Sequence, residues 1–178
     1  MTVAPVTAAD LQHAIRNVPD FPKPGIQFKD ITPLLADPRL LSGSIDLMTE
    51  GFKPGDVDAV VGIDARGFIF AAAAAVKLKA GFIPVRKKGK LPYHTHEQSY
   101  TLEYGTNTIA IHIDAIRPGS RVLLLDDLLA TGGTATAAAD LLERIGAKIL
   151  QIGFLIELGF LDGRKRLSRF PVKSQLFY

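Results

Sequence analysis

Residues 122–134 are Val122-Leu123-Leu124-Leu125-Asp126-Asp127-Leu128-Leu129-Ala130-Thr131-Gly132-Gly133-Thr134, and they indicate the fold class most directly. An apolar run typical of a buried strand leads into two carboxylates and then into a glycine-rich turn, and a helical pattern follows. Glycines let the backbone approach an anion closely, and the N–H groups at a helix N-terminus supply positive potential. We therefore predict that the turn from Ala130 to Thr134 binds a phosphate group, with its two Thr hydroxyls as additional donors.

The same alternation of strand, loop and helix extends over most of the chain. Apolar runs predict strands over 58–64, 82–86, 121–126 and 148–158, and helical patterns cover 68–79 and 134–145. Such alternation is typical of a parallel sheet covered by helices, so we predict an α/β fold. Ligands bind such sheets at the carboxyl ends of the strands, where Asp126 and Asp127 stand and can accept hydrogen bonds from paired sugar hydroxyls. The turn matches neither a Walker loop nor a dinucleotide fingerprint.

The N-terminal part is predicted to hold a short helix opening at residues 7–10 and a second helix from Asp37-Pro38 to about Lys53-Pro54-Gly55. The prolines between residues 19 and 24 indicate an irregular, stiffened segment. Residues 100–103 and 108–113 alternate apolar and polar side chains around Gly105, which predicts a hairpin. Without repeats or an interdomain linker, residues 1–178 are expected to form a single domain.

Composition narrows the class of protein. The chain has 178 residues, 47% of them hydrophobic and 22% charged, so it can bury a core. A net charge of +3 without a long basic block favours a small anionic substrate over nucleic acid. The chain has no cysteine, hence no disulfide and no thiolate nucleophile, and its longest apolar run, 67–76, is about half of a membrane span. We expect a cytoplasmic protein with no signal peptide and no membrane segment.

Residues 122–134 resemble the phosphoribosyl-pyrophosphate signature of the type I phosphoribosyltransferases. Further segments narrow the resemblance to the adenine phosphoribosyltransferases: 20–33, 64–68, 86–92, 102–105, 156–158 and 163–165. The resemblance implies a mostly parallel, twisted sheet flanked by helices, with a flexible hairpin loop. It also implies a small hood from about 1–35 and the C-terminal segment over a core of about 36–158. The implied activity makes AMP and pyrophosphate from adenine and phosphoribosyl pyrophosphate in purine salvage, and a homodimer is implied as well.

The resemblance also assigns site residues. Phosphate and ribose would be bound by Asp126, Asp127, Ala130, Thr131, Gly132, Gly133 and Thr134. Pyrophosphate would be bound by Asp64, Ala65, Arg66, Arg86, Lys87 and Lys90, with a cis peptide bond at Asp64–Ala65. Adenine would be bound by Gln27, Phe28, Lys29 and Leu128, and Glu103 and Arg66 would be catalytic. Mg²⁺ would be held mainly by the substrate, with contacts through water to Asp126 and Asp127.

Each role has a physical reason and a plainer alternative. Arg66 offers a planar, always charged fork of donors to a leaving anion, but it could also be a surface residue in a turn. Glu103 could accept the purine N9 proton, or could be an inert glutamate on an exposed strand. Phe28 could stack on a purine opposite Leu128, or could belong to the core.

The choice of base is assigned to the backbone of Gln27 and Lys29, which could match the 6-amino donor and N1 acceptor of adenine. A 6-oxopurine reverses both groups and would leave buried partners unpaired. The basic run from Arg86 to Lys90 leads into residues 89–99, which we expect to form a mobile lid, while Lys88 is expected to face solvent or a partner subunit. His94 and His96 match no metal site and receive no role.

Two alternatives stay open. The first is a phosphoribosyltransferase for a 6-oxopurine such as hypoxanthine, guanine or xanthine, because the phosphate loop alone does not choose the base. The segment from Phe21 to Pro33 argues against it. The second is a non-catalytic regulator that senses phosphoribosyl pyrophosphate and binds nucleic acid through an added domain, but the sequence contains no DNA-binding motif.

Overall fold

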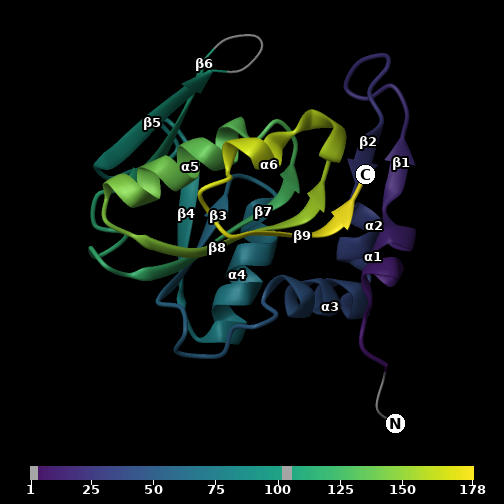
Figure 1. Ribbon diagram of the computed structural model, residues 1–178, viewed down its shortest axis with the longest axis horizontal. Helices are drawn as coiled ribbons and strands as arrows, with labels where there is room; N and C mark the ends of the chain where they lie inside the picture. Colours follow the sequence, from purple (N-terminus) through teal and green to yellow (C-terminus); the bar gives the residue numbers. More distant parts are fainter. Residues whose placement is uncertain (1–3, 102–105) are drawn as a thin grey trace. The chain divides into compact units, whose positions relative to one another are not determined.

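The structure is a computed structural model that describes residues 4–101 and 106–178 (Figure 1). The described chain separates into two compact units, Met1–Glu50 and Gly51–Tyr178. Each unit has its own secondary structure and is treated by itself below. The single domain and the hood expected from the sequence stay predictions.

The first unit combines three helices with a small hairpin. Its elements are α1 (Ala8–Ala14), β1 (Arg16–Val18), β2 (Phe28–Asp30), α2 (Thr32–Ala36) and α3 (Pro38–Met48). The two predicted helices are confirmed, but α3 ends at Met48, before the predicted Lys53-Pro54-Gly55. The Thr49 hydroxyl donates to the carbonyl of Ile45 over 2.6 Å at this end. The antiparallel β1–β2 pair flanks the proline-rich segment and was not predicted.

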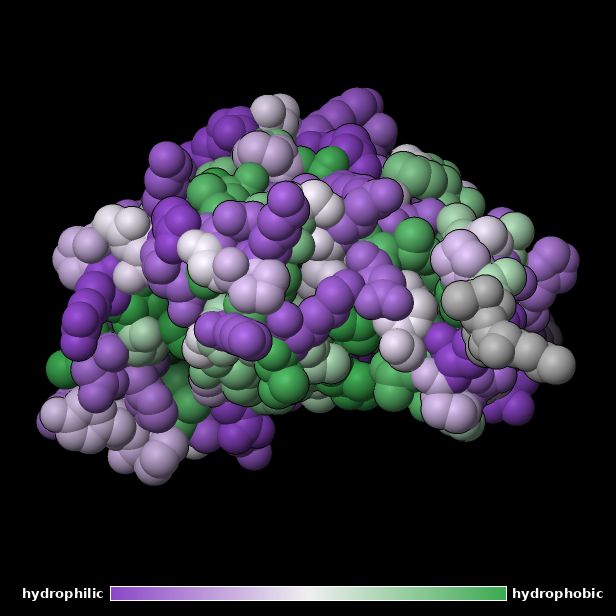
Figure 2. Space-filling view, turned by 90° about the horizontal axis from the view of Figure 1, so that it is seen from below, coloured by the Kyte–Doolittle hydropathy of each residue, from purple (hydrophilic) through white to green (hydrophobic). Residues whose placement is uncertain are grey.

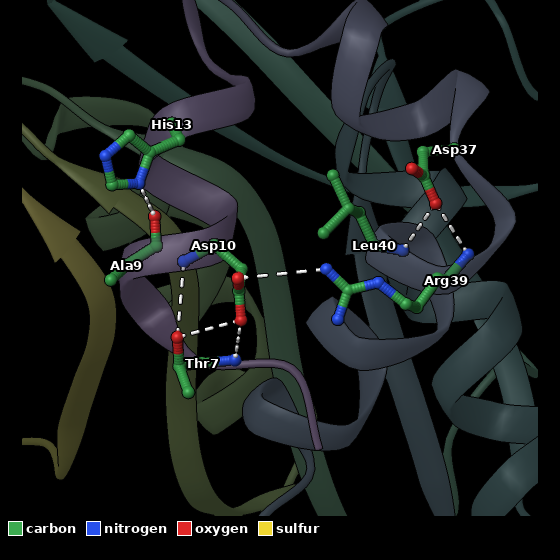
Figure 3. A network of polar contacts seen from close by, with 7 residues as sticks. All are labelled: Thr7, Ala9, Asp10, His13, Asp37, Arg39 and Leu40. Atoms are coloured by element: carbon green, nitrogen blue, oxygen red, sulfur yellow. Dashed lines mark hydrogen bonds and ion pairs between the residues drawn. The ribbon is translucent and has the colours of Figure 1, made fainter. Parts of the chain in front are cut away.

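Side chains at the helix N-termini explain where α1 and α3 begin (Figure 3). The Asp10 carboxylate accepts from the Thr7 N–H over 2.8 Å, and the Thr7 hydroxyl accepts from the Asp10 N–H over 3.3 Å. Asp37 accepts in the same way from the N–H groups of Arg39 and Leu40. Such caps satisfy donors that have no partner within the helix. An ion pair of 3.7 Å between Arg39 and Asp10 connects the two helices.

The second unit is built on a sheet whose strands, within the described residues, follow the order β5-β6-β4-β3-β7-β8-β9. The strands are β3 (Ala59–Ile63), β4 (Gly81–Lys87), β5 (Thr95–Thr101), β6 (Thr106–His112), β7 (Arg121–Leu129), β8 (Lys148–Glu157) and β9 (Val172–Phe177). The helices are α4 (Gly67–Leu78), α5 (Gly133–Arg144), η1 (Gly159–Leu161) and α6 (Gly163–Arg166). Strands β4, β3, β7, β8 and β9 are parallel, and β5 and β6 are antiparallel. The predicted mostly parallel α/β sheet is confirmed.

The sheet buries apolar side chains on both faces. Val61, Ile63 and Leu124 belong to one core cluster with the alanines and leucines of α5. On the other face a Cβ added to Gly62 would lie 2.8 Å from the Cβ of Ala71 in α4. Helices α4 and α5 therefore cover opposite faces, which explains why the central strands are apolar throughout.

Three predictions about the second unit need correction. The loop predicted over 89–99 is wrong in its second half, because residues 95–99 belong to β5 and pair with β6, and its role as a mobile lid stays a prediction. The predicted hairpin is correspondingly longer, and residues 102–105, including Gly105, lie outside the described residues. Strand β9 was not predicted, because Val172-Lys173-Ser174-Gln175 shows no apolar run, yet it pairs in parallel with β8. Polar strands at sheet edges give weak sequence signals.

The surface mixes hydrophobic and hydrophilic side chains, coloured green and purple in Figure 2. In the second unit the exposed apolar side chains include Ile69 and Val76 of α4 and Phe82 of β4, and Val76 is 81% exposed. None of the helices within residues 4–101 and 106–178 is long and apolar enough to cross a membrane.

Candidate active site

The polar residues singled out in the sequence meet at one edge of the sheet. Strand β3 lies between β4 and β7 and is parallel to both, so the carboxyl ends of the three strands are adjacent. Residues 64–66 follow β3, Arg86 and Lys87 end β4, and Asp126 and Asp127 lie near the end of β7. The Asp64–Ala65 peptide bond is cis, as predicted.

The predicted phosphate loop connects β7 to α5. Gly132 has a φ of +81°, a conformation that side chains other than glycine rarely adopt, and it stands directly before the first residue of α5. Asp126 and residues 128–135 line a cavity of about 90 Å³ at this turn. The loop thus presents backbone N–H groups and the N-terminal end of a twelve-residue helix to the cavity, as anion binding requires.

Two neighbouring carboxylates stand beside this cavity in different surroundings. Asp127 is buried and its Oδ2 lies 2.8 Å from Nε of Arg66. Asp126 accepts a hydrogen bond of 2.9 Å from the backbone N–H of Asp127. Burial raises the pKa of Asp126, and the nearby charge of Asp127 raises it further. Burial also raises the pKa of Asp127, against the lowering effect of Arg66. Sugar hydroxyls that donate here would stabilise the disfavoured charged forms.

A larger cavity of about 260 Å³ lies between the ends of β3 and β4 and the β5–β6 hairpin, and it holds part of the predicted pyrophosphate site. Its lining includes Asp64, Arg86, Lys87, Tyr100, Asn107 and Thr134. Arg86 is already engaged, because Nε donates to Asp64 over 2.9 Å and Nη1 donates to the carbonyl of Lys90 over 3.0 Å. Lys88 forms an ion pair of 2.7 Å with Glu97 of β5, and its side chain is 64% exposed.

The carboxylates of Asp126 and Asp127 could take part in binding a metal ion only if a substrate supplied most of the ligands. The described residues contain no group of three His, Asp or Glu side chains that could hold a metal ion. Asp126 and Asp127 can together offer outer contacts, but Asp127 is already paired with Arg66. This donor set fits Mg²⁺, which keeps waters and binds substrate phosphates.

The residues predicted to bind the base come from both units. Phe28 and Lys29 belong to β2 in the first unit, and Gln27 precedes them, whereas Leu128 lines the phosphate-loop cavity. Phe28 packs edge-on against Phe21 with ring centroids 5.0 Å apart. Lys29 donates to the side chain of Asn17 over 2.6 Å. The base-binding role stays a prediction, and Glu103 lies outside the described residues.

A family model described as "Phosphoribosyl transferase domain" matches residues 30–173. The chain is 58% identical over 162 residues to the adenine phosphoribosyltransferase of Acidothermus cellulolyticus, covering 91% of this chain and 92% of that relative. The chain belongs to the adenine phosphoribosyltransferase family. The resemblance carried by residues 122–134 and the other matching segments is therefore confirmed.

Solved structures of this family have the same fold. The adenine phosphoribosyltransferase of Rhodothermus marinus is 56% identical with a TM-score of 0.91, covering 96% of this chain and 98% of that one. The enzyme of Saccharomyces cerevisiae, solved with an imino-altritol bisphosphate and adenine, is 41% identical with a TM-score of 0.87, covering 93% and 96%. The predicted type I phosphoribosyltransferase fold is therefore confirmed.

The sequence did not indicate two residues that line the cavity of about 260 Å³ in this structure. Tyr100 of β5 accepts a hydrogen bond of 3.0 Å from the hydroxyl of Thr134 at the phosphate loop, and Asn107 of β6 lines the same cavity. The only signal was the predicted hairpin, which did not indicate where its side chains point. Their placement depends on contacts between residues 34 apart in the chain.

Proposed function

We propose that this chain transfers the phosphoribosyl group of phosphoribosyl pyrophosphate to adenine, giving AMP and pyrophosphate for purine salvage. The observation that carries the proposal is a phosphate loop beside a carboxylate pair, with Arg66 bound to Asp127 at the same edge of the sheet. The activity named for the relatives agrees with it.

The phosphate loop would hold the 5-phosphate of the substrate. The N–H groups at the start of α5 and the Thr131 hydroxyl would donate to phosphate oxygens, and the Thr134 hydroxyl would turn from Tyr100 to do the same. Asp126 and Asp127 would accept hydrogen bonds from the two ribose hydroxyls. This arrangement fixes the sugar at one end, so its C1 carbon is held for attack.

The cations would neutralise the leaving pyrophosphate. Arg66, Arg86, Lys87 and Lys90 are the side chains proposed for this task. The pyrophosphate would compete with Asp64 for Arg86, whose Nε lies 2.9 Å from the Asp64 carboxylate. Guanidinium groups stay charged throughout the reaction, so no change of protonation is needed.

Mg²⁺ would be held by pyrophosphate and ribose oxygens, with waters toward Asp126 and Asp127. When bound, it would spread the negative charge of the leaving group. The requirement for Mg²⁺ is implied by the family resemblance, and Asp126 and Asp127 would leave most ligand positions to substrate and water.

The base would be selected by the first unit. Phe28 would stack on adenine opposite Leu128, and the backbone of Gln27 and Lys29 would match the 6-amino group and N1. The N9 lone pair forms the new bond to C1 with inversion, the bond from C1 to the pyrophosphate oxygen breaks, and Glu103 takes the N9 proton.

The family resemblance also supports a homodimer, and the lack of cysteine agrees with a reducing cytoplasm. Exposed apolar side chains of α4, such as Val76, are available for a subunit contact. Sedimentation velocity at micromolar protein concentration tests the dimer, and a species with the mass of a single chain, 19.2 kDa, would contradict it.

Release of pyrophosphate on mixing the protein with phosphoribosyl pyrophosphate, adenine and Mg²⁺ tests the proposed reaction. We expect equal amounts of AMP and pyrophosphate, and no product with a chelator. A protein that binds phosphoribosyl pyrophosphate but releases nothing would instead be a sensor. Product formation unaffected by the chelator would contradict the Mg²⁺ requirement.

Glu103→Gln is the variant that isolates the proposed acid–base role. We expect kcat to fall by about 10²- to 10⁴-fold while substrate binding changes little, because the amide cannot accept the N9 proton. The measurement is steady-state AMP formation together with direct binding of phosphoribosyl pyrophosphate. Equal kcat values for the variant and the unmodified protein would rule the role out.

A further inference from the structure

Glu157 is a buried acid for which the proposed reaction has no use. Within the described residues, the least exposed acidic side chains are Asp127, which faces Arg66, and Glu157 at the end of β8, which is 6% exposed. A carboxylate is expensive to remove from water unless partners satisfy both of its oxygens. The partners of Glu157 therefore indicate what this side chain holds in place.

Glu157 is fully engaged by two other parts of the C-terminal segment. Its Oε1 accepts from Nε of Arg164 over 2.9 Å, and its Oε2 accepts from Nη2 of Arg164 and from the hydroxyl of Ser174 over 2.6 Å. Arg164 also donates to the carbonyl of Val172 over 2.9 Å. Hydrogen bonds from Arg164 lower the pKa of Glu157, so the pair is ionised at neutral pH. One guanidinium thus ties α6 to β8 and β9.

The residue before Arg164 touches the phosphate loop. A Cβ added to Gly132 would lie 2.6 Å from the carbonyl oxygen of Gly163. A Cβ added to Gly163 would overlap the carbonyl oxygen of Ala130 and lie 2.9 Å from the N of Gly132. Gly163 does not have a positive φ, so its lack of a side chain answers a need for space. The backbones of the loop and of α6 are packed against each other.

The sheet register brings the ion pair close to the same loop. Glu157 is the register partner of Leu129, the last residue of β7, and Leu158 N–H donates to the carbonyl of Leu129 over 2.9 Å. The loop residue Ala130 follows directly. In Figure 1 the yellow C-terminal segment, with α6 and β9, lies beside β8 and α5, and contacts join these elements.

We propose that Glu157 and Arg164 are positioning residues that hold the phosphate loop in its binding conformation, acting through the backbone contact between Gly163 and Gly132. The ion pair fixes the start of α6, and α6 in turn limits the positions that residues 130–132 can take. A preformed loop loses less conformational freedom when it binds a phosphate. The identity of the phosphate ligand rests on the proposed function.

The test compares Arg164→Gln with Arg121→Gln. Arg121 forms a similar two-pronged pair with Asp58, with contacts of 2.7 and 3.1 Å, at the opposite end of β7, and both arginine side chains are 42% exposed. Binding of ribose 5-phosphate is measured by calorimetry well below the melting temperature of each variant, and KM and kcat for phosphoribosyl pyrophosphate are measured beside it.

For Arg164→Gln we expect the Kd for ribose 5-phosphate and the KM for phosphoribosyl pyrophosphate to rise about 10- to 100-fold, with kcat at saturation changed less. For Arg164→Lys, the Kd and KM should lie between those of the unmodified protein and of Arg164→Gln, because lysine keeps the positive charge but cannot form the two-pronged contact with Glu157. Arg121→Gln should stay within about twofold. Unchanged binding in Arg164→Gln, or an equal loss in Arg121→Gln, would overturn the proposal.

If Arg164→Gln does not fold, Gly163→Ala against Gly159→Ala tests the backbone contact through which the ion pair is proposed to act. A Cβ on Gly159 would lie 3.6 Å from its nearest neighbour, an ordinary contact, so this variant should bind like the unmodified protein. Equal binding by the two glycine variants would overturn the proposal. Ribose 5-phosphate binding needs no catalysis, so a protein that binds it but forms no AMP contradicts the proposed reaction alone. A protein that does not bind ribose 5-phosphate overturns the inference itself.

Discussion

At the scale of single residues, the charged carboxylates near the end of β7 lower the stability of the folded protein, and a bound ligand would compensate for this cost. The raised pKa values of Asp126 and Asp127 mean that the folded protein pays in free energy to keep these groups charged at neutral pH. Functional sites commonly keep such groups because a ligand compensates for the cost when it binds. Arg66 offsets part of this effect for Asp127, with its Nε 2.8 Å from the carboxylate.

Asp126→Asn should therefore stabilise the protein while it impairs the reaction. A carboxyl whose pKa is raised by folding contributes most stability below its unfolded value of about 3.9, and this contribution is lost as the pH rises through the folded value. Asparagine does not ionise, so the variant does not lose stability as the pH rises. We therefore expect the melting temperature of Asp126→Asn to exceed that of the unmodified protein by about 2–4 °C at pH 7, and by less at pH 4.

Calorimetric melting at both pH values checks this prediction, and AMP formation should fall by at least about tenfold in the same variant. A lower melting temperature at pH 7 would show that the charge of Asp126 stabilises the fold. Full activity would show that Asp126 does not bind ribose.

Gly67, the first residue of α4, lies against the carboxylate of Asp126. A Cβ there would lie 2.7 Å from Oδ1 of Asp126 and 3.0 Å from the carbonyl oxygen of Leu125. We expect Gly67→Ala to lower the free energy of unfolding by about 1–3 kcal/mol, because backbone or carboxylate must move. Urea unfolding measures this change. Gly81→Ala is the control, since its Cβ would meet nothing closer than 3.8 Å, and equal effects would contradict the steric explanation.

At the scale of elements, the β5–β6 hairpin is held against α5 by Arg144. Its Nη1 donates to the Gln98 side chain over 3.1 Å, and Nη2 donates to the carbonyl of Glu97. At the other end of α5, the Thr134 hydroxyl donates to Tyr100. The hairpin therefore touches both ends of the helix that begins at the phosphate loop.

Arg144→Ala should loosen β5 without disturbing the rest of α5. Loss of the two hydrogen bonds to β5, with a net contribution of at least about 1 kcal/mol, should speed amide exchange in residues 95–101 by at least about fivefold. Arg169→Ala is the matched control, because Arg169 pairs with Asp140 and Glu143 of the same helix. Hydrogen exchange read by mass spectrometry compares the two variants. Faster exchange of β5 in both, or in neither, would contradict the role of Arg144.

The elements differ in how far sequence could predict them. Strands β3, β7 and β8 and helices α4 and α5 were predicted within a few residues, because both-face burial gives long apolar runs. The β1–β2 pair, the first half of β5 and β9 were missed. These are short or polar strands, which carry weak local sequence signals.

At the candidate active site, the sequence predicted which loops contribute residues, but it did not predict which side chains of these loops contact each other. The phosphate loop followed from a local motif, and the Asp64–Ala65 cis bond followed from the family resemblance. The pairing of Arg86 with Asp64, 22 residues apart, and the contact of Gly163 with Gly132 depend on the register of neighbouring strands. Local pattern does not determine such long-range contacts.

At the scale of the whole molecule, the parallel arrangement places the loop ends of β3, β4 and β7 at one edge of the sheet. Cations and carboxylates gather there, while the opposite end of β7 carries the ion pair of Arg121 with Asp58. In the proposed function, this edge of the sheet binds the phosphoribosyl group. The choice of base is assigned to Gln27, Phe28 and Lys29 of the first unit.

The most direct test of the proposed activity measures nucleotide and pyrophosphate formation from phosphoribosyl pyrophosphate with adenine, hypoxanthine or guanine in turn, each with Mg²⁺ and with a chelator. We predict that adenine alone reacts, at least about 10³-fold faster than either 6-oxopurine, because a reversed donor and acceptor leave buried partners unpaired. A reaction with a 6-oxopurine alone would contradict the assignment of adenine to residues 27–29, and no reaction with any base would contradict the enzymatic function.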